Sequence, residues 1–146
     1  MDCPPIEARF YGAVIAGHKA AKDWVGIPAA IFTDPEIATV GLGEQQAKEK
    51  GIEVRVGKFP FAALGRAMAV NETEGFIKVL IDPDTKEILG AHAVGAEATE
   101  LIHELLLART AELLPEDIAT MIHAHPTLSE AVMEAMRAAE GWAIHI

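Results

Sequence analysis

Residue types that suit proton transfer stand together near the C-terminus, where His123 to Glu130 read HAHPTLSE. His125 precedes a proline, and Glu130 supplies a carboxylate at the start of a helix-like segment. A histidine with one ring nitrogen held by a carboxylate is a well-oriented proton acceptor near neutral pH. The run therefore predicts one half of a general acid–base site, formed by His125 and Glu130.

The same run also has a structural interpretation. Thr127 and Glu130 occupy the N-cap and N3 positions of a capping box ahead of an apolar helical pattern. A carboxylate in the first turn also suits the helix dipole. On the residues alone, capping is favoured over catalysis for Glu130, and His125 would be a partly buried polar residue of a turn. Pro126 permits a cis peptide bond after His125.

Other common sites receive little support from the sequence. His123 and His125 could share a metal ion, but a site needs further ligands, and the chain has one cysteine, Cys3. His103 and Glu104 open like a zinc-protease motif, but a leucine occupies the place of its second histidine. The sequence lacks G-x-G-x-x-G, the P-loop, C-x-x-C and G-x-S-x-G. We therefore expect no bound metal.

The composition is that of a globular domain with an acidic balance. The 146 residues carry a formal net charge of −10, from 12 basic and 22 acidic residues, which argues against nucleic acid and anionic membranes as partners. A single cysteine excludes an internal disulfide and fits a reducing cytoplasm, where we expect the protein. No apolar run approaches the length of a membrane span, and no basic segment indicates a signal peptide.

The elements that would position the pair fall into two groups. Strand-like runs are predicted at 27–33, 37–42, 53–59, 75–81 and 87–94, with a polar helix at 43–50 and an ambiguous segment at 62–71. The turn formers Asp82 to Lys86 predict an antiparallel hairpin between the last two strands. Helices are predicted at 96–114, 115–121 and 128–140.

Strands first and helices afterwards predict an α+β fold. We expect residues 24–146 to form one domain and residues 1–23 to be an appendage.

Several blocks of the chain resemble the C-terminal interface domain of the flavin-dependent pyridine nucleotide–disulfide oxidoreductases. The blocks are Thr33–Ala38 with Val40-Gly41, Lys58–Phe61 followed by Gly65–Ala67, Gly75–Val79, Ile88–His92 and the closing run His123–Glu130. The closing run is most similar to the dihydrolipoamide dehydrogenase branch of this family. The resemblance implies an antiparallel sheet of about five strands with helices packed on one side.

The resemblance also implies roles for the chemical pair. His125 matches the acid–base histidine that reaches the redox-active dithiol of the partner subunit, and Glu130 matches its orienting carboxylate. This reverses the preference for a capping role. The backbone of His123, Ala124, His125 and Pro126 matches the family's turn beside the partner's flavin, with the peptide before the proline cis.

The resemblance further implies partners and cofactors. The parent enzyme would use FAD, NAD and dihydrolipoyl groups, whereas this chain, without their binding motifs, is expected to bind none of them and to be inactive alone. Residues 1–23 would then be a remnant of the preceding flavin domain or an added segment. We expect a homodimer, and the negative charge suits docking to a basic subunit-binding domain of an acyltransferase core.

Three interpretations remain open. The first is the interface domain of a dihydrolipoamide dehydrogenase, or the same domain from a related flavoprotein disulfide reductase. The second is a stand-alone dimerisation or docking module without chemistry. The third is an unrelated hydrolase with a His/Glu general base, which the missing nucleophile motifs disfavour.

Overall fold

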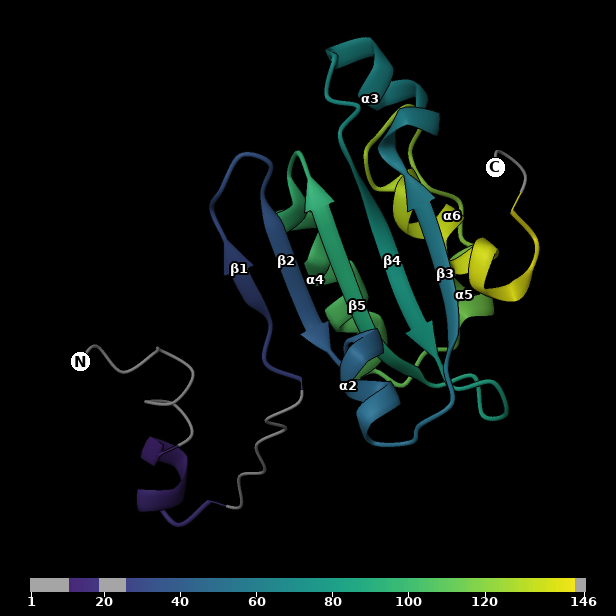
Figure 1. Cartoon of the computed structure of the whole chain (residues 1–146). Coiled ribbons are helices and arrows are strands. Elements are labelled where there is room, and N and C mark those ends of the chain that lie inside the picture. The colour runs from purple at the N-terminus through teal and green to yellow at the C-terminus, as the bar shows by residue number, and fades with distance from the viewer. Residues whose placement is uncertain (1–10, 19–25, 144–146) are drawn as a thin grey trace.

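A five-stranded antiparallel sheet organises the chain (Figure 1). The computed structural model describes residues 11–18 and 26–143. The sheet has the order β1-β2-β5-β4-β3, and every neighbouring pair is antiparallel. Its strands are β1 (Ala29–Ile31), β2 (Ile37–Gly41), β3 (Arg55–Pro60), β4 (Gly75–Ile81) and β5 (Ile88–Gly95). The predicted α+β class and five-stranded sheet are confirmed.

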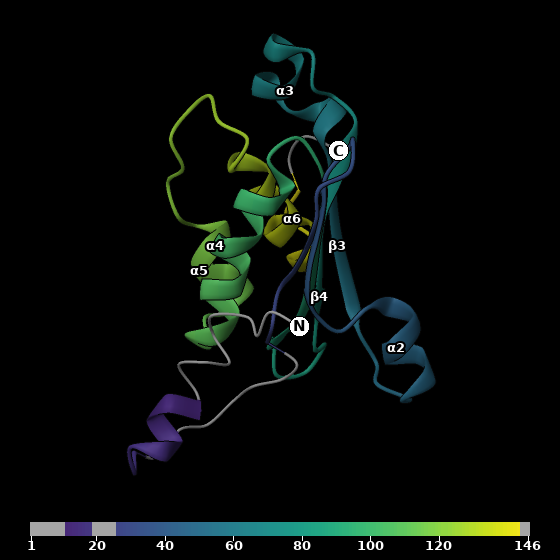
Figure 2. The same cartoon turned by 90° about the vertical axis from the view of Figure 1, so that its left-hand side faces the viewer.

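Three helices cover one face of the sheet (Figure 2). They are α4 (Ala98–Thr110), α5 (Pro115–Ala119) and α6 (Glu130–Glu140). The short α2 (Glu44–Glu49) lies at the opposite face, so one small helix departs from the one-sided packing that the resemblance implies. Residues 11–15 are helical as well.

The ambiguous segment 62–71 resolves into short helices. A 3₁₀ turn, η1 (Phe61–Ala63), is followed by α3 (Gly65–Val70), which ends at Asn71 in the left-handed conformation. Asparagine adopts that conformation at a lower conformational energy than most residues, so it is suited to end the helix. The predicted boundary between residues 23 and 24 lies outside the described residues.

The predicted hairpin of β4 and β5 is confirmed. Oδ1 of Asp82 accepts hydrogen bonds from the amides of Asp84, at 2.9 Å, and Thr85, at 2.8 Å. An aspartate that binds its own following backbone closes a turn without help from the rest of the protein. Local chemistry therefore sets this connection.

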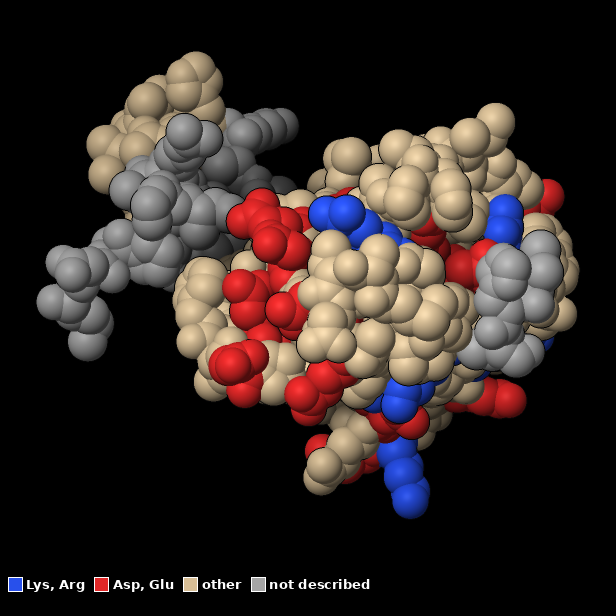
Figure 3. Space-filling view, turned by 90° about the horizontal axis from the view of Figure 1, so that it is seen from above, with Lys and Arg blue, Asp and Glu red and all other residues tan. Residues whose placement is uncertain are grey.

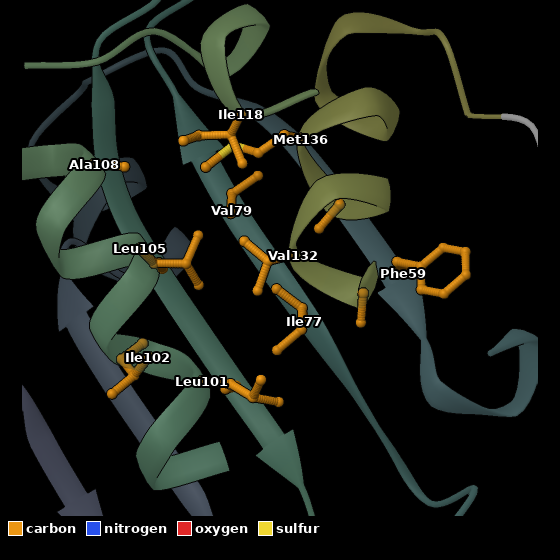
Figure 4. Packing of buried hydrophobic residues seen from close by; sticks show 14 of the residues in the cluster. Phe59, Ile77, Val79, Leu101, Ile102, Leu105, Ala108, Ile118, Val132 and Met136 are labelled. Carbon is orange, nitrogen blue, oxygen red and sulfur yellow. The ribbon is translucent and has the colours of Figure 1, made fainter. Parts of the chain in front are cut away.

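The core lies between the sheet and the three helices (Figure 4). Ile77 and Val79 of β4 are fully buried against Leu105 of α4 and against Val132 and Met136 of α6. These side chains follow the period of two in the strand and the helical period in α4 and α6. The core therefore holds α6, which carries Glu130, at a defined place over the sheet.

Candidate active site

His125 and Glu130 meet at the start of α6. Nδ1 of His125 lies 2.9 Å from Oε1 of Glu130. A carboxylate only accepts hydrogen bonds, so Nδ1 carries the hydrogen, and the neutral ring keeps its lone pair on Nε2. The His125 side chain is 77% exposed, whereas the Glu130 side chain is 16% exposed. The arrangement presents an oriented proton acceptor to the outside of the domain.

The second oxygen of Glu130 holds the loop that carries His125. Oε2 accepts the backbone N–H of Thr127 at 2.9 Å. The Thr127 hydroxyl donates to the carbonyl of Ala124 at 2.7 Å, and the peptide between His125 and Pro126 is cis. One carboxylate therefore bridges the histidine ring and the backbone of the same turn.

These bonds make only half of the predicted capping box. The N3-type carboxylate of Glu130 reaches the Thr127 amide, but the Thr127 hydroxyl turns back to Ala124 and does not cap the helix. The helix α6 begins at Glu130, with Ser129 as its N-cap, two residues later than the sequence pattern suggests. Glu130 is thus both a backbone anchor and the partner of His125.

The pKa of Glu130 is lowered from its ordinary value of 4.5. Partial burial alone would raise this pKa, because it penalises the charged form. The hydrogen bonds from the Thr127 amide and from His125, together with the positive potential of His125 and His123, outweigh burial. Glu130 is therefore a carboxylate near neutral pH, which is the form that an orienting partner of histidine requires.

The side chain of His123 bonds to a different helix from that of His125. Its side chain is 5% exposed, and its Nε2 lies 2.8 Å from Oε1 of Glu104 on α4. Nδ1 lies 3.4 Å from the carbonyl of Met121. Over residues 11–18 and 26–143, no cluster of three or more His, Cys, Asp or Glu side chains could hold a metal ion.

An open groove of about 390 Å³ runs beside the pair. It is lined by Phe59, Ala63, Leu64, Gly65, His125, Glu130, Met133, Glu134 and Arg137. The groove gives a substrate or a neighbouring chain access to one side of His125.

Two charged residues of the groove, Glu134 and Arg137, were not predicted as site residues. Glu134, whose side chain is 3% exposed, accepts from Nη1 of Arg137 at 2.8 Å, and Nε of Arg137 donates to the carbonyl of Ala119 at 2.9 Å. The bond from Arg137 to Ala119 ties α6 to the end of α5, where the loop that carries His125 begins. The i,i+3 spacing of the acid and the base was the available signal.

Acidic side chains gather at the end of the sheet where the chain passes from β1 to β2 (Figure 3). A shallow groove there is lined by Asp34, Glu36, Glu72, Glu74 and Glu97, together with Thr33, Pro35 and Ala96. Part of the net charge of −10 is therefore concentrated on one surface.

Comparison with known proteins shows the family of the chain. Residues 27–136 match the dimerisation domain of the pyridine nucleotide-disulphide oxidoreductases. The chain belongs to this family and comprises its dimerisation domain.

The sequence relatives include dihydrolipoyl dehydrogenases. The protein of that name from Geobacillus stearothermophilus is 51% identical over 140 residues, which cover 96% of this chain and 30% of that protein. Dihydrolipoyl dehydrogenase 2 from Haloarcula marismortui is 55% identical over 139 residues, covering 95% and 29%. The chain thus spans about a third of the length of these relatives.

Solved structures show the same fold. LpdA from Mycobacterium tuberculosis superposes with a TM-score of 0.84 at 25% identity, over 90% of this chain and 29% of that one. The Cu(II) complex of the flavoprotein disulfide reductase RclA from Escherichia coli gives a TM-score of 0.81 at 28% identity, over 90% of this chain and 30% of that one.

Among the described residues, no helix is long and apolar enough to cross a membrane.

Proposed function

We propose that this domain belongs to a dihydrolipoyl dehydrogenase and brings the His125–Glu130 pair to the redox-active dithiol of a partner subunit. The observation that carries the proposal is the orientation of His125. Its Nδ1 is held by the largely buried carboxylate of Glu130, while the His125 side chain is 77% exposed. A base that faces outward suits a site completed by a second subunit.

The proposed reaction step is a proton transfer followed by thiol–disulfide exchange. Nε2 of His125 takes the proton of a dihydrolipoyl thiol, and Glu130 stabilises the imidazolium that forms. The thiolate then attacks one sulfur of the disulfide, so that a new S–S bond forms as the old one breaks and its other sulfur leaves as a thiolate. The base is needed because a free thiol, with a pKa of about 8.5, is mostly protonated at pH 7.

The cofactors of the proposed parent are FAD and NAD, which other parts of that protein would hold. FAD, when bound, would take the electron pair of the dithiol, and NAD would carry it away. From this chain, the half-buried His123 and the exposed residues Ala124, His125 and Pro126 form the segment that we propose lies beside a partner's flavin. We expect the 146-residue chain alone to bind neither cofactor and to show no turnover.

The partners belong to the same proposal. We propose that the chain forms a homodimer and that its parent docks to a basic subunit-binding domain of an acyltransferase core. The acidic groove formed by Asp34, Glu36, Glu72, Glu74 and Glu97 supports the second contact by charge complementarity. Replacing Glu72 and Glu74 by Gln should weaken binding of such a domain and its salt dependence, whereas the exposed Glu53→Gln should not. Equal binding by all variants would remove the groove from the proposal.

A chimera tests the catalytic part. Residues 27–146 of this chain replace the matching C-terminal part of the Geobacillus stearothermophilus enzyme, and NADH-dependent reduction of lipoamide is measured. Reduction of an artificial dye, which takes electrons from the flavin directly and needs no thiol base, is the control. His125→Gln should lower lipoamide turnover about 100-fold or more and leave dye reduction near its original rate.

The same experiment decides between the proposal and a module that only dimerises. An inactive chimera that still binds flavin and forms dimers would favour dimerisation without chemistry. Full lipoamide turnover in His125→Gln would rule out His125 as the base.

A further inference from the structure

The loop that carries His125 contains a second histidine–carboxylate pair. Nε2 of His123 and Oε1 of Glu104 are 2.8 Å apart, with 5% of the His123 side chain and 25% of the Glu104 side chain exposed. The first pair is presented to the outside, whereas this second pair is packed between the loop and α4. Because the carboxylate only accepts, Nε2 of His123 carries the hydrogen of the bond.

The second pair lies where the loop lacks regular structure. Residues 120–129 connect α5 to α6 without a helix or strand, and the loop projects beyond the helices (Figure 2). On its C-terminal side, the turn is held by Glu130 and by the Thr127–Ala124 bond. On its N-terminal side, the side-chain bond from His123 to Glu104 reaches a different helix, 19 residues earlier in the sequence.

The exposed segment Ala124–Pro126 therefore lies between two residues whose hydrogen bonds hold the loop, His123 and Thr127. All three of its residues are exposed. His125 is oriented by Glu130, but its position relative to the rest of the domain depends on both ends of the loop. Misplacement of a catalytic group by about 1 Å is enough to cost about 100-fold in rate.

We propose that Glu104 is a positioning residue, which fixes His123 and thereby the place of the His125 ring relative to α4 and the sheet. The proposal rests on the proposed function of His125 for its kinetic consequence, but its structural part stands independently.

The first test uses the 146-residue chain and the ¹⁵N and ¹³C NMR signals of its histidine rings. With the loop held, His125 should show one dominant tautomer, with the hydrogen on Nδ1. Glu104→Ala should mix the tautomers or broaden these signals by exchange, whereas Glu104→Gln, whose amide oxygen still accepts from His123, should preserve them. Glu100→Ala, an exposed acid one turn earlier on α4, is the matched control.

The second test measures turnover of the chimera described above. Glu104→Ala should lower lipoamide reduction about tenfold or more with dye reduction unchanged, and Glu104→Gln should recover most of the loss. If Glu104→Ala does not fold, Glu104→Asp replaces it in both tests. Aspartate keeps the charge, but its shorter side chain brings the carboxylate less far toward His123, so the same direction of change is expected. Full turnover and unchanged His125 signals in the folded variant would overturn the proposal, as would equal losses of lipoamide and dye reduction.

The two proposals fail in different ways. If His125→Gln keeps lipoamide turnover while Glu104→Ala still disturbs the His125 ring signals, the catalytic role fails and the positioning role holds. If His125→Gln abolishes turnover and Glu104→Ala changes neither measurement, the opposite holds.

Discussion

Gly57 of β3 lies directly beneath Ala135 of α6, and a Cβ at position 57 would collide with the Ala135 carbonyl and with Ala139. The helix that begins at Glu130 therefore sits closer to the sheet than any side chain at position 57 would allow. This contact sets the height of α6 above β3. The site at the start of α6 depends on it, because Glu130 holds both His125 and the Thr127 amide.

Gly57→Ala should destabilise the domain by about 1–3 kcal/mol, because either the strand or the helix has to move. Urea denaturation followed by circular dichroism measures the change. Gly65→Ala is the matched control, since a Cβ there would meet nothing within 4 Å. Similar stabilities of the two variants would contradict the close approach.

Glu130→Gln should lower lipoamide turnover of the chimera about tenfold or more. The amide keeps most of the shape but removes the negative charge that stabilises the imidazolium and fixes the ring. The loss should be smaller than in His125→Gln, because the base itself remains. A larger loss in Glu130→Gln than in His125→Gln would argue that the carboxylate acts chiefly on the backbone of the turn.

Stability should depend on the ionisation of Glu130 in acid. Its pKa in the folded chain is below the ordinary 4.5, so the charged form favours folding. The contribution is present above the ordinary pKa and is lost as the pH falls through the folded pKa. The stability difference between the original chain and Glu130→Gln should therefore shrink below about pH 4.5. Urea denaturation at pH 7, 5 and 3.5 measures it, and a constant difference would contradict the assignment.

Arg137→Met should destabilise the domain by about 3–5 kcal/mol. The substitution removes the partner of the buried Glu134 carboxylate and the donor to the Ala119 carbonyl. Thermal unfolding measures the loss. Lys78→Met breaks the more exposed ion pair with Glu44 and should cost no more than about 1 kcal/mol. Equal effects would show that burial does not distinguish the two pairs.

Elements with local causes could be predicted from the sequence. The strand β4 occupies the predicted residues 75–81, since a continuous run of strand formers ends at a turn that Asp82 closes by itself. The residues suggested the pairing of His125 with Glu130, but they favoured a capping role for Glu130, and only the resemblance to the family reversed that preference. The conformation of the ambiguous segment 62–71 was not predictable, since its short helices depend on the part of the fold against which they pack.

The reactive run itself, its acid–base residue types and the apolar periods that form the sheet and helices are properties of the sequence. Tertiary structure alone decided that His123 turns inward to Glu104 and that α6 packs closely on Gly57. The physical reason is distance along the chain. A hydrogen bond or a close contact between segments far apart in sequence leaves no periodic pattern in either of them, and only the folded chain brings the partners together.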